Sequence, residues 1–408
     1  MTAEVAILNT QGAAIAADSA VTIGLGSGEN KIYYTAEKIF NISDSRPIGV
    51  MIYNSAEFMG INWKLILNEY SNKLTEKDRF KKLEDCIKNF IKFLADFEYE
   101  YMENKQNEYL IKICVRICSI LKKYISDIYQ LEYPDNKDDD NGLSKKEVIK
   151  LFSSALKKRN DELKNAKIQF PDFSGKFILS NTELVKNIAE QALQIQVTEK
   201  NLEELINLLI FEVKTGINGI NYSGVVFVGY GDEEIFPSVC SVKVFGKLGV
   251  DLTYIPDEPV HIGVTKTAMI KPYAQIDVIN TFICGIDPEL KRHITENILP
   301  KLFNQFLENF NEEKTKNILA ESLKEILNEF DKELTEDIFR VNTSPILEIV
   351  SSLPTINLAE MAESLINITS LRRHNSTDQD TVGGPTDVAI ISKVDGFVWV
   401  KRKNTLSY

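Results

Sequence analysis

Strand-like segments occur at both ends of the chain and again in its middle, and two long helical stretches separate them. Residues 5–53 and 224–264 contain short apolar runs bounded by glycine-containing turns, and residues 387–401 have the pattern of a hairpin. A two-stranded hairpin is too small to be stable alone, so the closing strands must join a sheet that includes earlier ones. This order favours one discontinuous α+β body over two domains in a row.

The intervening stretches have helical periodicity. Leu83, Ile87, Phe90 and Leu94 recur at three- and four-residue spacing. Helices return from about Tyr273, and a last helix is expected at 358–373. We therefore predict a single domain over residues 1–408, with helical insertions at 65–215 and 290–355.

Composition restricts the partners. The 408-residue chain has 47 Lys and Arg against 59 Asp and Glu, a net charge of −12. Nucleic acids and anionic membranes would be repelled, so neither is an expected partner. No apolar run approaches the length of a bilayer span, and the N-terminus is unlike a secretory signal. Five scattered cysteines are typical of reduced, buried thiols, and we expect a cytoplasmic protein.

Three features of the sequence could suggest metal or phosphate binding, but each lacks residues that such a site requires. The acidic segment 135–142 lacks acidic ligands at the first and last positions of a calcium loop. Segment 24–31 lacks the Gly-Lys-Ser/Thr core of a phosphate loop. Cys114 and Cys118 lie one helical turn apart in an apolar stretch with no nearby histidine, which favours core packing over a metal site. We expect no cofactor and no metal.

The three histidines, His261, His293 and His374, are far apart in sequence, and no Gly-x-Ser-x-Gly elbow accompanies them. A Ser-His-Asp enzyme is therefore poorly supported, although residues distant in sequence can converge in space.

A different set of motifs points to chemistry at the N-terminus. A strand beginning at Thr2 turns at Gly12 and returns as Ala-Ala-Asp18-Ser-Ala-Val-Thr22. Lys38-Ile-Phe opens a later strand, Gly-Tyr-Gly-Asp occurs at 229–232, and Asp380-Thr-Val-Gly-Gly precedes the closing strand. In order and spacing these motifs resemble the proteasome β-subunit family, including its simpler bacterial relatives, over about half of the chain.

The resemblance implies a four-layer αββα sandwich of the N-terminal-nucleophile (Ntn) hydrolases, with antiparallel sheets and expanded helical insertions. It implies a threonine-type peptidase or amidase whose nucleophile is Thr2 after Met1 is removed. Lys38 would lower the pKa of the hydroxyl, Asp18 would orient Lys38, and Asp380 would bind near the amine. The substrate-binding residues would be Thr22, Tyr53, Asn54 and Ser55, with a backbone N–H of 53–55 as the oxyanion donor.

The chemistry agrees with this assignment. A threonine hydroxyl is a weak nucleophile at neutral pH and needs an adjacent base. A free α-amino group, with a pKa of about 7.7–8, can serve within the same residue once Met1 is gone. The resemblance further implies a peptide or protein substrate, a homo-oligomer and an ATPase unfoldase partner.

Departures from the family pattern support a second hypothesis. Ala20 replaces an arginine, Tyr53-Asn54 replaces a glycine pair, and Gly383 replaces a serine of the amine's network. A second family serine has no counterpart, and Gln275 or Asp277 would substitute for it. The alternative is a proteasome-fold protein with little turnover that acts as a binding or assembly module through its insertions. The presence of Thr2, Asp18 and Lys38 together favours the enzyme.

Overall fold

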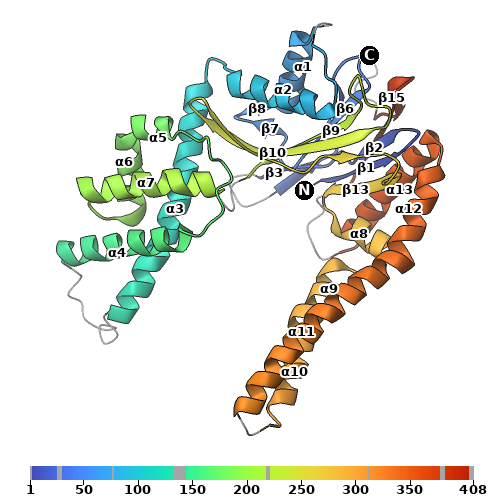
Figure 1. Ribbon diagram of the computed structural model, residues 1–408. Coiled ribbons are helices and arrows are strands. Elements are labelled where there is room, and N and C mark those ends of the chain that lie inside the picture. Colours follow the sequence, from blue (N-terminus) through green and yellow to red (C-terminus); the bar gives the residue numbers. More distant parts are fainter. Residues whose placement is uncertain are drawn as a thin grey trace.

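The computed structural model describes residues 2–24, 30–75, 78–132, 144–216, 221–310, 313–376 and 382–403. Over these residues the chain is a mixed α+β structure with antiparallel sheets (Figure 1). The predicted α+β class is confirmed. No helix in the described part of the chain has both the length and the apolar character needed to cross a membrane.

The first sheet joins strands from both ends of the chain. β2 pairs with β1 on one side and β14 on the other, so that Ala17 lies opposite both Glu4 and Asp387. The prediction that the closing hairpin shares a sheet with the opening strands is confirmed. In spatial order the strands are β13 (Ala268–Ala274), β1 (Ala3–Asn9), β2 (Ala13–Ala17), β14 (Asp387–Ser392) and β15 (Gly396–Lys401).

Strand β13 differs from the prediction of helices from about Tyr273. The strand runs to Ala274, and the next helix begins only at Asp277. Lys271 and Pro272 interrupt its apolar pattern. β13 is an edge strand, and an edge tolerates both a charged side chain and a residue without an N–H group.

The second sheet is built around two strands from the middle of the chain and one from its start. β9 pairs with β6 on one side and β10 on the other. In order the strands are β11 (Asp251–Pro256), β10 (Ser238–Leu248), β9 (Ser223–Gly229), β6 (Ile48–Tyr53) and β5 (Ile39–Asn41), with β12 (Val260–His261) also pairing with β10. Two small hairpins pair β3 (Val21–Gly24) with β4 (Asn30–Tyr33) and β7 (Glu57–Phe58) with β8 (Ile61–Asn62).

The two sheets pack against each other through one face each. Ala6, Leu8 and Ile15 of the first sheet share a buried cluster with Met51 and Val226 of the second. The approach is close: a Cβ added at Gly49 would lie 2.9 Å from the Ile391 side chain. Since successive strand residues face opposite sides, Thr2 and Glu4 are on the same face of β1 as Ala6 and Leu8. That face is the one between the sheets.

Helices cover the outer face of each sheet. Trp63 of α1 (Trp63–Lys73) and Phe90 of α2 (Leu83–Asp96) pack on Phe227 of the second sheet. Ile279 of α8 (Asp277–Cys284) and Leu358 lie over the first sheet. Leu358 belongs to α13 (Thr355–His374). This helix covers the outer face of the first sheet together with α12 (Ser344–Ser352).

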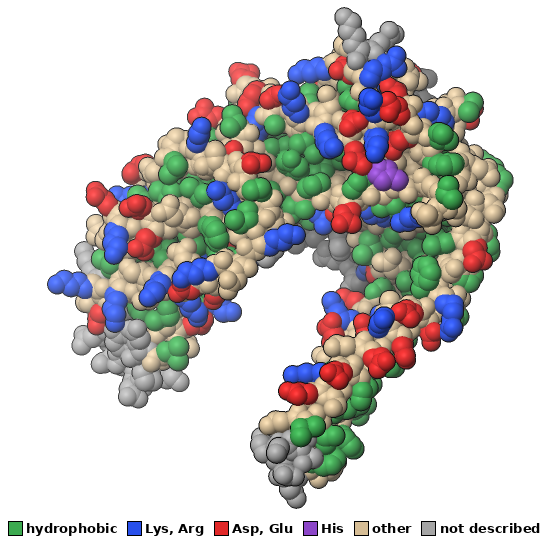
Figure 2. Space-filling view, in the orientation of Figure 1, with side chains coloured by type: hydrophobic (Ala, Val, Ile, Leu, Met, Phe, Trp, Pro, Cys, Tyr) green, Lys and Arg blue, Asp and Glu red, His purple; other side chains and the backbone are tan. Residues whose placement is uncertain are grey.

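Two helical arms extend from this body (Figures 1 and 2). The first arm, residues 102–215, has a core of its own and comprises α3 (Met102–Glu132), α4 (Lys145–Leu163), α5 (Lys176–Ser180), α6 (Thr182–Leu193) and α7 (Glu199–Thr215). The second arm, residues 288–343, comprises α9 (Pro288–His293), η1 (Ile294–Ile298), α10 (Leu299–Leu307), α11 (Glu313–Ile338) and η2 (Phe339–Thr343). The domain and insertion limits given above remain predictions.

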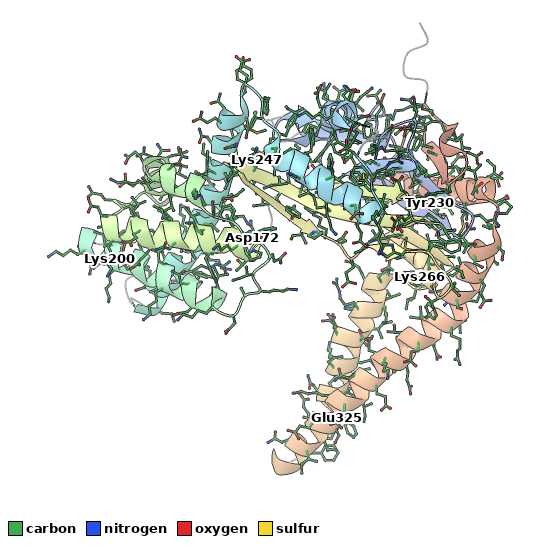
Figure 3. The ribbon with its side chains drawn as sticks, turned by 45° about the horizontal axis from the view of Figure 1, so that its top comes forward. Asp172, Lys200, Tyr230, Lys247, Lys266 and Glu325 are labelled. Carbon is green, nitrogen blue, oxygen red and sulfur yellow. The ribbon has the colours of Figure 1, made fainter. Side chains whose placement is uncertain are left out.

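The first arm is tied to the body at its base. The buried ammonium of Lys247, labelled in Figure 3, lies at the end of β10. It donates to the Phe97 carbonyl at 3.0 Å and to Glu98 Oε1 at 2.6 Å, in the linker that leads into α3. A charged group at this buried position is stabilised only with such partners, so the linker is held in one place.

Candidate active site

Thr2 lies at the start of β1 and is nearly buried, with 7% of its surface exposed. Its carbonyl accepts a hydrogen bond from Gln275 N at 3.1 Å, which ties it to the chain that follows β13. Its Oγ1 is buried and has no hydrogen-bond partner among the described residues. Met1 lies outside them. The backbone of Thr2 is thus held in place by a hydrogen bond, while the Thr2 hydroxyl makes no hydrogen bond to the described residues.

Asp18 is the central acceptor of the site. It follows β2 directly, and the pairing of β2 with β1 brings it beside the residue after Thr2. Asp18 Oδ1 accepts from Ala3 N at 2.9 Å and from Lys38 Nζ at 2.6 Å. Asp18 Oδ2 accepts from Ala20 N at 3.1 Å and Gly383 N at 3.0 Å. One buried carboxylate therefore connects the N-terminal strand, the lysine and the late glycine turn.

Lys38 enters this site from the opposite sheet. It precedes β5, and its carbonyl accepts from Ile52 N of β6 at 2.9 Å. Burial lowers the pKa of the ammonium, while the charges of Asp18 and Glu4 oppose that effect. The ion pair with Asp18 is almost wholly removed from water. Its attraction is therefore only weakly screened by solvent.

Glu4 is a site residue that the sequence analysis missed. Its side chain is 0% exposed, and neither carboxylate oxygen has a hydrogen-bond partner among the described residues. Burial raises the pKa of this carboxyl to about 8, with the Lys38 charge acting in the opposite direction and the Asp18 charge adding to the increase. The carboxyl is therefore largely protonated at neutral pH. The only sequence signal is a charged residue in the otherwise apolar run of β1.

A second ion pair anchors the C-terminal end of the chain beside the site. Lys403 Nζ lies 3.0 Å from Asp387 Oδ2 and donates to Ser19 Oγ at 3.1 Å and to the Ala36 carbonyl. Ser19 in turn donates to the Pro385 carbonyl. These contacts hold the turn that contains Gly383 against the loop that carries Asp18.

The predicted Asp380 lies outside the described residues, but the glycine turn after it is defined. Gly384 has φ +78°, a conformation that favours glycine, and a Cβ there would meet the Tyr34 side chain at 2.7 Å. Thr22 lies in β3 opposite Ile32, and its side chain is outside the described part of the chain.

The predicted segment Tyr53-Asn54-Ser55 leaves β6 through a left-handed turn. Asn54 has φ +73°, which asparagine tolerates better than most residues, and its amide donates to the Tyr222 carbonyl at 2.8 Å. Ser55 N donates to the Tyr53 carbonyl at 3.1 Å. Tyr53-Asn54 replaces the glycine pair of the proteasome β-subunit pattern, and Asn54 adopts the positive φ that a glycine would also allow.

The Tyr53 side chain points inward. Its ring packs against those of Tyr222 and Tyr273, with centroids 6.2 and 5.6 Å away. It lies so close to Gly224 that a Cβ there would be 1.9 Å from the ring. The side chain fills the space between the sheets, so it helps to shape the site from within.

A cavity of about 690 Å³ adjoins this segment. Ser55 and Tyr222 form part of its wall, and Lys112 and Arg116 of α3 line the opposite side. We call it the α3 groove. It extends from the predicted substrate-binding segment to the base of the first arm.

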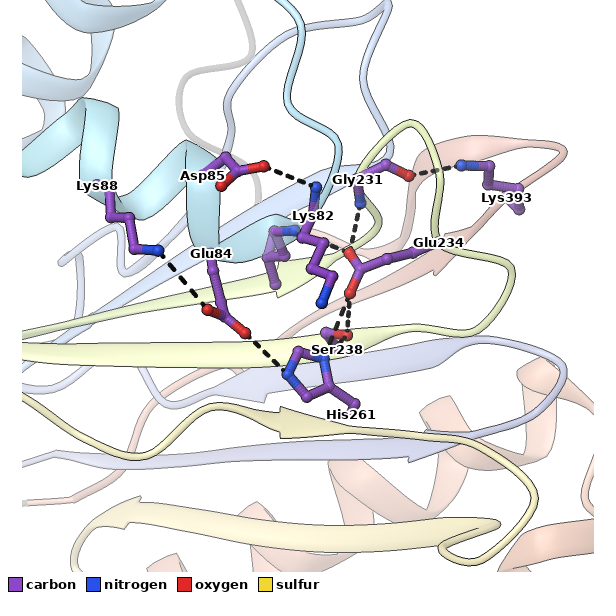
Figure 4. A network of polar contacts seen from close by, with 10 residues as sticks. Lys82, Glu84, Asp85, Lys88, Gly231, Glu234, Ser238, His261 and Lys393 are labelled. Carbon is purple, nitrogen blue, oxygen red and sulfur yellow. Dashed lines mark hydrogen bonds and ion pairs between the residues drawn. The ribbon is translucent and has the colours of Figure 1, made fainter.

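A serine, a histidine and a glutamate also converge, in a second place (Figure 4). His261 Nδ1 lies 2.9 Å from Ser238 Oγ, and His261 Nε2 lies 3.0 Å from Glu84 Oε1. However, the Ser238 hydroxyl donates to Glu234 Oε1 at 2.6 Å, and Ser238 is 1% exposed. Both imidazole nitrogens thus face acceptors, because the Ser238 hydroxyl already donates its proton to Glu234. This arrangement connects α2 to β10 and does not suit a general base that takes a proton from serine.

The arrangement around Thr2 brings a hydroxyl, a cation and two carboxyl groups together at the junction of the sheets. Within the described residues, no group of three or more His, Cys, Asp or Glu side chains could hold a metal ion. The chain matches none of the known protein-family models, and no curated protein is similar to it in sequence.

Proposed function

We propose that the chain is an N-terminal threonine hydrolase, a peptidase or amidase, and that its two packed sheets with helices on both outer faces are the αββα sandwich of the Ntn hydrolases. One observation carries the proposal. The Asp18 carboxylate binds both the Ala3 N–H, next to Thr2, and the Lys38 ammonium. The lysine cation is thereby linked, through one carboxylate, to the residue that follows Thr2.

In the proposed reaction, Thr2 Oγ1 attacks the carbonyl carbon of an amide, and its proton passes to the Thr2 amine freed by removal of Met1. The amine gives that proton to the departing nitrogen as the C–N bond breaks, leaving an ester on Thr2. Water then adds to the ester, restoring the hydroxyl and releasing the acid.

Two residues would support these steps. Lys38 would favour the developing alkoxide electrostatically. The Asn54 N–H would serve as the oxyanion donor, because the neighbouring Ser55 N–H is already bonded to the Tyr53 carbonyl. Peptides or proteins would be the substrates.

The test combines intact mass with an epoxyketone probe, which reacts with the hydroxyl and the free amine together. We expect Met1-free protein to gain the mass of one probe and to hydrolyse peptides. Thr2→Ala should lose both activities, while Thr10→Ala, a matched change in the turn after β1, should keep them. Equal absence of adduct and hydrolysis in wild type and Thr2→Ala, with Met1 removed, would refute the proposal.

One observation favours the alternative, a binding or assembly module with little turnover. Thr2 Oγ1 is buried with no partner among the described residues, so a substrate carbonyl needs an opening at this position. The same experiment separates the two functions, since a module would bind partners with Thr2 unreactive.

A further inference from the structure

The second arm has no buried side chain among its described residues. Leu302 and Phe306 of α10 are 53% and 49% exposed, and Ile326 and Phe330 of α11 are also exposed. Each pair is four residues apart and therefore lies on one face of its helix. Exposed apolar side chains on both helices of a projecting arm mark an interaction surface.

The same arm has a row of glutamates on α11 that form no ion pairs with the described residues. Glu321, Glu325, Glu329 and Glu333 follow one another at four-residue spacing on α11. Among the residues that the structure describes, none of them has an ion-pair partner within 4.0 Å. Like charges at this spacing destabilise an isolated helix. Figure 2 shows acidic side chains along this arm, and Figure 3 labels Glu325 on it. The row would be stabilised by a basic partner.

The first arm has a complementary face. On α3, Lys112 and Arg116 are four residues apart and line the α3 groove, and neither has an ion-pair partner in the described part of the chain. Exposed Ile111 and Val115 lie beside them, and the aromatic ring of Phe245 forms part of the opposite wall. The groove thus combines apolar surface with two unpaired cations. Its other charged lining residues are the paired Lys105 and Glu108 and the carboxylate of Glu57, so the balance of its lining is positive by one charge.

We propose that the second arm of one copy of this chain docks in the α3 groove of another copy, with Glu325 and Glu329 facing Lys112 and Arg116. Both charge pairs have the same four-residue spacing, about 6 Å along a helix. α11 and α3, about 39 and 46 Å long from their 26 and 31 residues, can align over several turns.

The partner is a second copy because both complementary faces belong to one sequence. Within one molecule the two arms leave the body at separate places, and an open gap lies between them (Figures 1 and 2). The contact is head-to-tail, so it either closes into a ring or continues as a filament. This inference concerns assembly and goes beyond the proposed hydrolase activity, although the α3 groove adjoins the predicted substrate-binding segment.

The test is a charge swap on the full chain, read as mass by light scattering. We expect wild type to have at least twice the 46.3 kDa of one chain. An arm variant, Glu325→Lys with Glu329→Lys, and a groove variant, Lys112→Glu with Arg116→Glu, should each be monomeric. Their equimolar mixture should recover the wild-type mass, because each reversed face meets a face of opposite charge.

The control reverses two exposed lysines elsewhere, Lys200→Glu with Lys266→Glu, with the same change in net charge as the groove variant. It should assemble like wild type. Monomeric wild type would overturn the proposal. So would a groove variant that still assembles, because the contact would then be arm to arm.

Carbodiimide cross-linking of mixed light and ¹⁵N-labelled chains provides a second readout. Links between Lys112 and glutamates of α11 should join light to heavy chains. Links found only within one isotope would mean that the arms close within a molecule and would overturn the proposal. Loss of assembly when a peptide substrate fills the groove, with no inter-chain link to α11, would assign the groove to substrate instead.

Discussion

Glu4→Gln tests whether a buried carboxyl beside the candidate nucleophile is neutral in the folded protein. Glutamine has nearly the shape of protonated glutamic acid but cannot ionise. Glu4 is wholly buried with no hydrogen-bond partner among the described residues, so its anionic form has little compensation. The substitution should therefore change the pH dependence of stability more than stability at low pH.

The magnitude follows from the pKa of about 8 in the folded chain against an ordinary 4.5. Below pH 4.5 the carboxyl is protonated in both states. Between 4.5 and about 8 the unfolded chain releases the proton while the folded chain keeps it, so stability falls as pH rises. At about 1.4 kcal/mol per pH unit the loss is about 3 kcal/mol at pH 7 and about 5 kcal/mol above pH 8.

The assay is denaturant unfolding of wild type and Glu4→Gln from pH 5 to pH 9. The free energy of unfolding of the variant should rise relative to wild type by several kcal/mol across this interval, and level off above about pH 8. Exposed Glu258→Gln is the matched control and should follow the wild-type curve. Parallel curves for wild type and Glu4→Gln would show that Glu4 ionises normally, and the reasoning would fail.

Three further substitutions test the site and its surroundings. Lys38→Met leaves the buried Asp18 carboxylate without its cation and should lower the free energy of unfolding by about 3–5 kcal/mol in denaturant; a loss below 1 kcal/mol would contradict the buried ion pair. Ser238→Ala should cost about 1–3 kcal/mol through lost hydrogen bonds yet leave epoxyketone labelling unchanged, whereas loss of labelling at full stability would make Ser238 the nucleophile. Gly224→Ala forces a Cβ into the Tyr53 ring and should destabilise by about 1–3 kcal/mol, and a double-mutant cycle with Tyr53→Ala should show strong coupling; additive effects would contradict the contact.

Local patterns predicted much of the body. The runs at 13–17 and 387–392 are mostly apolar, which predicts strands covered on both faces. In the structure both are largely buried strands of one sheet. Lys38 and Asp18 form an ion pair, as expected from the positions of the two residues in the motifs that resemble the proteasome β-subunit family. Each residue adjoins a short strand that the apolar pattern predicts. Their roles in catalysis remain predictions.

The rest depended on contacts that no local pattern encodes. β13 becomes a strand because β1 offers it an edge, although Lys271 and Pro272 weaken its own pattern. Glu4 looks like an ordinary solvated residue until the second sheet covers it. Ser238, His261 and Glu84 meet only because α2 packs over β10. In each case burial by a distant element decides the outcome.

The pairing of β2 with β14 has a consequence for biosynthesis. Ala17 and Asp387 are opposite each other in the sheet, yet almost the whole chain is made between them. During synthesis β2 therefore presents one unpaired apolar edge until β14 leaves the ribosome, and such an edge readily pairs with other chains. Closing so long a loop is also a slow step in folding. Nascent chains should thus depend on chaperones until β14 has been made, and loss of β14 and β15 should lead to aggregation instead of a smaller folded protein.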